Sequence, residues 1–182
     1  MREVRTISRK DSQVRTLLDV RQIPPDVGYY LAGFADGEGS FNVAFRKRRD
    51  YVRLPWKVSL CFNVSQRDEA MLRLFQVHLT CGTLRMRADG VWYFEVNRLE
   101  EITSCVIPFF ERFSFLSAKK QRDFEKFKKL ACLMMDCRHL SRDGLRLILE
   151  IRSDMNDGGA RRRKYSDAEI LRHLGESSET IR

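Results

Sequence analysis

The apolar residues of this chain change their spacing at one point, and that change constrains the fold more than any other feature. Between Asp26 and Ala35 they recur three and four positions apart, which predicts a short helix that Gly37 and Gly39 end. From Ser40 apolar and polar residues alternate, the pattern of a half-buried strand. A helix that passes directly into a strand at a glycine-rich step is therefore the first element of the fold.

The same order then recurs along the chain. Alternation over 57–64 predicts a second strand, helical spacing over 68–79 a helix, and residues 83–97 a hairpin that turns at 88–90. Further helices are expected at about 99–113, 118–136 and 141–156, and a short one starts at the capping box of Ser166 and Glu169. Tyr29, Tyr30 and the Phe-rich stretch 109–115 are expected in the core. This order predicts an α+β fold.

The net charge limits the classes of partner that this chain is expected to have, and its cysteines limit the compartment. The formal charge of +9 favours a polyanionic partner, either nucleic acid or an anionic membrane surface. Five cysteines without a CxxC pair indicate free thiols in a reducing compartment, and no apolar run approaches a membrane span. We expect an intracellular protein with no membrane partner, located in the cytoplasm or nucleoid, or in a chloroplast or mitochondrion if an organelle encodes it.

Polar and basic side chains occupy the alternate positions of all four predicted strands. Arginine pairs with guanine edges, asparagine with adenine and serine with either, so such a face has the chemistry of major-groove recognition. An ordinary solvent-exposed sheet face, or a face that binds RNA, remains open at this point. The candidate DNA-binding residues are Ser40, Asn42, Arg46, Arg48, Lys57, Ser59, Asn63, Arg85, Arg87, Tyr93 and Glu95.

Two acids, Asp36 and Glu38, stand where the first predicted helix ends. The carbonyl end of a helix carries negative potential, so acids there need either full exposure to water or a compensating cation. A divalent metal ion is such a cation, because Mg²⁺ takes oxygen ligands. The small residues of the same stretch permit another helix to approach closely, and they are Ala32, Gly33, Ala35 and Gly37.

The stretch LAGFADGEGSF (31–41) resembles the motif of the LAGLIDADG homing endonucleases. Further segments resemble family segments in the family's order: FNVSQRDE (62–69), GTLR (82–85), FLSAKKQRDFEKFK (115–128) and HLSRDGLRLILEIRSDMNDGG (139–159). The resemblance covers about 27–159. It thus predicts an endonuclease domain at 27–159, between a polar N-terminal extension (1–26) and a basic C-terminal tail with a short helix (160–182).

The resemblance implies an αββαββα core whose twisted, antiparallel four-stranded sheet forms a DNA-binding saddle. It also implies a divalent-metal-dependent endonuclease that hydrolyses phosphodiester bonds at a specific, long, nearly palindromic site in double-stranded DNA. One motif in this sequence implies a homodimer. The motif helix would then lie at the dimer interface through Leu31, Ala32, Gly33 and Phe34.

The resemblance also implies roles for individual residues. Glu38 matches the acid that binds Mg²⁺ (Mn²⁺ or Ca²⁺ can occupy the same site), and the backbone carbonyl of Gly37 would complete the coordination. Asp36 is the second choice as a metal ligand, since its position more often serves the structure of the motif. Gln66 matches a residue that orients the attacking water, and Lys119 one near the scissile phosphate. The alternative for both is an ordinary polar side chain on the protein surface.

One position departs from the family pattern, and two other functions remain open. Ala70 stands where some relatives place a basic residue, so Arg67 or Arg73 is a candidate substitute. A maturase that binds intron RNA would use the same basic sheet, and a DNA-binding protein that has lost cleavage would keep the fold. The acid at Glu38 favours the nuclease over both.

Overall fold

The computed structural model describes residues 18–48, 54–155 and 164–176, and it confirms the predicted α+β architecture. Two helices each precede a hairpin: α1 (Pro25–Glu38) precedes β1 (Gly39–Lys47) and β2 (Trp56–Gln66), and α2 (Glu69–Leu79) precedes β3 (Thr83–Met86) and β4 (Trp92–Val96). The strands form one antiparallel sheet in the order β1-β2-β4-β3. The remaining helices are α3 (Leu99–Glu101), α4 (Ile107–Arg112), α5 (Ala118–Met135), α6 (Arg142–Ser153) and α7 (Asp167–Glu176).

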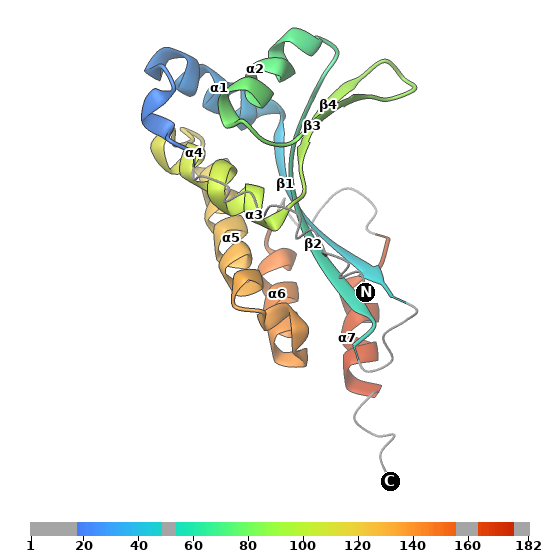
Figure 1. Cartoon of the computed structure of the whole chain (residues 1–182). Coiled ribbons are helices and arrows are strands. Elements are labelled where there is room, and N and C mark those ends of the chain that lie inside the picture. The colour runs from blue at the N-terminus through green and yellow to red at the C-terminus, as the bar shows by residue number, and fades with distance from the viewer. Residues whose placement is uncertain (1–17, 49–53, 156–163, 177–182) are drawn as a thin grey trace, which may run out of the picture.

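Helices α3 to α6 lie along one side of the sheet (Figure 1). The core between them is rich in phenylalanine, and Phe41, three residues after the end of α1, sits at its centre. Its ring lies within 6 Å of five other rings, those of Phe62, Phe110, Phe115, Phe124 and Phe127. This cluster packs the junction between α1 and β1 against α4 and α5. The two acids of the motif lie at that junction.

The predicted alternation is confirmed on both long strands. Phe41 and Phe45 of β1 are buried, as are Val58, Leu60 and Phe62 of β2, while the residues between them are half-buried or exposed. The Phe-rich stretch 109–115 is core as expected. The expectation for Tyr29 and Tyr30 is wrong: their side chains are 59% and 58% exposed. The helix turns them outward, because Gly28, Leu31, Ala32 and Ala35 occupy its buried face.

The predicted helix over 99–113 contains a π-helical turn at Ile102–Val106 between α3 and α4. Pro108 lacks an amide hydrogen, so the carbonyl of Ser104 loses its usual partner four residues on. The backbone amide of Leu18 donates to that carbonyl instead, at 2.9 Å. The segment before α1 is thereby docked from Leu18 onward, with a 3₁₀ turn at Val20–Gln22 and a buried Ile23. Residues 1–17 lie outside the described part.

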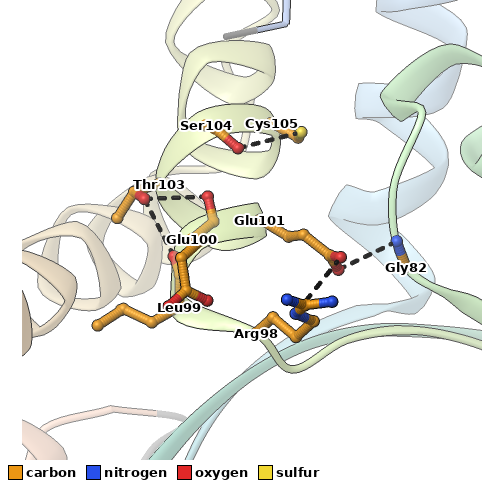
Figure 2. A network of polar contacts seen from close by, with 8 residues as sticks. All are labelled: Gly82, Arg98, Leu99, Glu100, Glu101, Thr103, Ser104 and Cys105. Atoms are coloured by element: carbon orange, nitrogen blue, oxygen red, sulfur yellow. Dashed lines mark hydrogen bonds and ion pairs between the residues drawn. The ribbon is translucent and has the colours of Figure 1, made fainter. Parts of the chain in front are cut away.

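The base of the β3–β4 hairpin is tied to α3. Gly82 has a φ of +78°, and a Cβ there would lie 2.8 Å from the ring of Phe94, so only glycine fits this turn. Its amide donates to Oε2 of Glu101 at 3.3 Å, and Nε of Arg98 lies 3.8 Å from the same carboxylate (Figure 2). The hairpin therefore projects from a fixed base.

The C-terminal helix belongs to the same core as the endonuclease domain predicted at 27–159. The hydroxyl of Ser166 accepts from the amide of Glu169 at 3.1 Å, as half of the predicted capping box, and Ile170 and Leu174 of α7 are buried. The buried Arg152 of α6 pairs with Asp167 at 3.2 Å. Figure 1 shows α7 beside the far end of the β1–β2 ribbon, where Trp56 packs edge-on against Tyr165 and His173. Within the described ranges, no helix is long and apolar enough to span a membrane.

Candidate functional site

The two acids of the motif have different environments at the end of α1. Asp36 is half-buried and accepts two hydrogen bonds from Ser117, one from its backbone amide at 3.0 Å and one from its hydroxyl. The hydroxyl of Ser117 also accepts from the amide of Lys120, as the N-cap of α5. Asp36 thus ties α1 to α5. Glu38 is the last helical residue, and its side chain is exposed.

The ammonium group of Lys120 reaches the motif. Its Nζ donates to the backbone carbonyl of Gly39, directly after the motif helix. Burial lowers the pKa of Lys120 below the ordinary 10.5, although the Asp36, Asp123 and Glu38 carboxylates oppose this shift. The contact with Gly39 places the ammonium group of Lys120 at the residue that directly follows Glu38.

The sequence analysis assigned the position near the scissile phosphate to Lys119, the residue directly before Lys120. Lys119 is exposed on α5, and its assignment to a phosphate contact stays a prediction. Consecutive helical residues point about 100° apart, so the two lysines serve different faces. Lys120 shares its face with the buried Phe124 and Phe127, four and seven residues on. That spacing is the sequence signal that identifies Lys120 as a half-buried lysine.

Gln66 lies at the same end of the sheet as Glu38. Gly39 pairs with Val64, so β2 runs past the start of β1 and ends at Gln66. Gln66 is half-buried, and its Oε1 accepts from the amide of Arg67 at 2.8 Å. Glu38 and Gln66 therefore lie at the same end of the sheet, and their catalytic roles stay predictions.

The structure separates the two arginines proposed to replace a basic residue at Ala70. Ala70 is exposed in the first turn of α2. Arg73 forms an ion pair with Glu69 one turn earlier on the same helix. Arg67 is exposed next to Gln66 and therefore lies nearer to the candidate site in the chain.

The outer face of α1 differs from the expected contact surface. Leu31 and Ala32 are 0% and 2% exposed, because their side chains pack inside this chain's own core, and their assignment to a dimer interface stays a prediction. Phe34 is half-buried against Phe75. The exposed face consists instead of Tyr30, Gly33 and Gly37, and a Cβ at either glycine would meet no atom within 4 Å.

The candidate DNA-binding residues share one face of the sheet, as predicted. Residues directly opposite each other in antiparallel strands point to the same side, and one row of partners crosses all four strands: Ser40, Asn63, Glu95 and Thr83. Asn42, Arg46, Lys57, Ser59, Arg85 and Tyr93 stand at positions on the same side, and Arg48 and Arg87 follow the ends of β1 and β3.

A hollow of about 930 Å³ opens on this polar face. Its lining includes Arg46, Lys57, Ser59, Arg85 and Glu95. Cys61 also lines it, and burial, reinforced by the charge of Glu95, raises the pKa of the Cys61 thiol to about 12. The hollow therefore presents basic and hydrogen-bonding groups together with one neutral thiol.

Comparison with known proteins agrees with this geometry. The model of the LAGLIDADG endonuclease family matches residues 31–131, a span that runs from the motif helix through most of α5. The chain therefore belongs to the LAGLIDADG endonuclease family.

Individual relatives show the extent of the similarity. A probable intron-encoded endonuclease 2 of Neurospora crassa is 30% identical over 146 residues, which cover 78% of this chain and 32% of the relative. The chain thus spans about a third of the length of that relative. The crystal structure of the homing endonuclease I-TnaI is similar with a TM-score of 0.68 and 29% identity, and the match covers 85% of this chain and 98% of that one.

A second similar structure is bound to DNA. I-SmaMI, bound to an uncleaved DNA target in the presence of calcium ions, has a TM-score of 0.67 and 27% identity. The match covers 76% of this chain and 47% of that chain.

Proposed function

We propose that this chain is a site-specific endonuclease that cuts both strands of a long, nearly palindromic DNA site as a homodimer, with divalent metal held at Glu38. The observation that carries the proposal is the different environment of the two acids at the end of α1. Asp36 accepts two hydrogen bonds from Ser117, whereas Glu38 is exposed directly before Gly39, whose carbonyl accepts from Nζ of the half-buried Lys120. An exposed carboxylate at the negative end of a helix is suited to a cation.

The donor groups at this point fit a hard divalent ion. Mg²⁺ is usually held by one or two carboxylates, with water and phosphate oxygens filling the other positions. Glu38 supplies a carboxylate, and Gly37 lies among the last four residues of α1, whose carbonyls lack N–H donors within the helix. The similar protein I-SmaMI was bound to its uncleaved DNA target in the presence of calcium ions, which supports a divalent cation here. A bound metal would polarise the scissile phosphate and favour ionisation of the attacking water.

The outer face of α1 supports pairing of two copies. Gly33 and Gly37 lie one helical turn apart with open space above both, and small residues allow helix backbones to approach closely. A second α1 packed on this face would bring a second Glu38 to the same end. Each copy would then supply one carboxylate to the pair of scissile phosphates.

The chain's own side chains have separate tasks in this scheme. The polar face of the sheet, with Arg46, Lys57 and Arg85, would bind the duplex. Lys120 would hold the Gly39 backbone and place positive charge next to the scissile phosphate, where charge develops in the transition state. Gln66 would orient water through its amide group.

The test uses a duplex that the protein itself selects from a randomised library in Ca²⁺, followed by cleavage in Mg²⁺. Glu38→Gln is expected to bind the selected duplex within about threefold of the wild type and to cut it at least about 100-fold more slowly, the usual cost of losing one electrostatic group of an active site. Glu150→Gln, an exposed acid of α6, is the matched control and should cut normally. Normal cleavage by Glu38→Gln, or one chain per cut duplex in sedimentation, contradicts the proposal.

A further inference from the structure

The arginine and glutamate at the centre of the β3–β4 hairpin form a side-on pair. Nε of Arg85 donates to Oε2 of Glu95 at 3.0 Å, and Nη2 donates to Oε1 at 3.0 Å. The two residues stand diagonally across the hairpin, since Glu95 is the partner of Thr83 and Arg85 the partner of Tyr93. The side chain of Glu95 is 16% exposed and that of Arg85 60%, so the carboxylate lies beneath the guanidinium.

This pairing leaves the outer end of the guanidinium available. The guanidinium of arginine carries five N–H donors in a fixed plane. A carboxylate bound to Nε and Nη2 occupies the side edge, and the end edge formed by Nη1 and Nη2 still offers two parallel N–H groups. Two parallel donors match the O6 and N7 acceptors of guanine in the major groove.

The second arginine of the hairpin is held in a different way. Nη1 of Arg87 donates to the hydroxyl of Tyr93 at 2.7 Å, and Nη2 lies 3.4 Å from Oδ2 of Asp89. Its guanidinium also stacks over the Tyr93 ring, 5.1 Å from the centroid. Both terminal nitrogens of Arg87 are therefore in contact with other side chains. Arg87 is suited to an electrostatic contact and not to a bidentate hydrogen bond.

The support beneath Arg85 is rigid. The hairpin is fixed at its base by the bond from Gly82 to Glu101 (Figure 2). Glu95 is also the direct partner of Asn63 on β2, in the middle of the sheet. A side chain held in its bound geometry loses less conformational freedom when it meets a ligand, which favours recognition.

We infer that Arg85 reads a single guanine in each half of the DNA site and that Glu95 is a positioning residue that holds Arg85 for this contact. The inference rests on the proposed function and revises the sequence expectation that Glu95 itself contacts DNA. The carboxylate of Glu95 is 16% exposed and lies beneath the guanidinium of Arg85, so it is poorly accessible to a cytosine amino group. Arg87 contributes a phosphate contact without base preference.

The test is selection of duplexes from a randomised library by the full chain in Ca²⁺, followed by sequencing. The variants are Arg85→Ala, Arg85→Lys, Glu95→Gln and, as the control, Arg87→Ala. Wild-type protein should enrich guanine at one position per half-site by about 5- to 150-fold, the range for a good bidentate contact. Arg85→Ala and Arg85→Lys should remove that preference, and the lysine variant should keep its overall affinity.

Glu95→Gln decides the positioning role. It should weaken the guanine preference at the Arg85 position and at no other, while its overall affinity for DNA rises because one negative charge is lost. Arg87→Ala should weaken binding to all sequences equally. An unchanged guanine preference in Glu95→Gln, or loss of a cytosine preference elsewhere, overturns the inference. Failure of the wild type to enrich any sequence refutes the proposed function instead.

Discussion

Replacing each acid of the motif in the metal-free protein separates their roles. Asp36→Asn keeps one acceptor oxygen for Ser117 but loses the charge and the second acceptor. Glu38→Gln removes an exposed charge from the end of α1 and leaves the hydrogen bonds of Asp36 intact. If Asp36 ties α1 to α5 and Glu38 awaits a cation, only the first substitution should destabilise the fold.

The magnitude follows from the two hydrogen bonds. A bond to a charged group contributes about 1.5–3 kcal/mol and a neutral one about 0.5–1.5 kcal/mol. Because Asp36 is half-buried, water reduces the difference, and the loss should be about 1–2 kcal/mol. Removing an acid from the last turn of a helix raises the free energy of unfolding by about 0.3–1 kcal/mol. Asp36→Asn should therefore lower the free energy of unfolding by about 1 kcal/mol, which corresponds to about 2–4 °C in Tm.

The assay is urea and thermal unfolding followed by circular dichroism in EDTA. Glu38→Gln should be as stable as the wild type or slightly more stable, since the unfavourable acid at the helix end is gone. Ser117→Ala is the partner variant. The double variant Asp36→Asn/Ser117→Ala should lose less stability than the sum of the single losses, because the two side chains share one contact. Additive losses, or a destabilised Glu38→Gln beside a normal Asp36→Asn, would refute the assignment.

Three further outcomes test the fold and the polar face. Phe41→Ala should cost about 3–5 kcal/mol of unfolding free energy, since its ring is fully buried among other rings; urea unfolding measures it. Arg152→Ala should cost about 3–5 kcal/mol by leaving Asp167 without its buried partner, and limited proteolysis should then release α7. With a pKa near 12, Cys61 should react with iodoacetamide at pH 8 about 30- to 60-fold more slowly than an ordinary thiol, and Glu95→Gln should speed it by lowering that pKa; peptide mass spectrometry follows both.

The motif shows where prediction from sequence reached its limit. Residue types and spacing identified the family and singled out Glu38 as the candidate metal ligand, because both depend on a contiguous stretch of chain. The roles of its neighbours depended on distant residues. Asp36 is occupied because Ser117, 81 residues later, caps α5 at that point. The buried side of α1 was likewise decided by packing, which placed Leu31 and Ala32 inside and Tyr29 and Tyr30 outside.

The sequence by itself determined the order of the elements, the polar face of the sheet and the acid at the end of the motif helix. Periodicity and capping are local, and they act between residues a few positions apart. Only the tertiary structure decided that Lys120 reaches the motif, that Arg85 pairs with Glu95, and that Arg87 pairs with Tyr93. Those contacts depend on the register of β3 against β4 and on how α5 packs beside α1, and both arise from the global arrangement of the core.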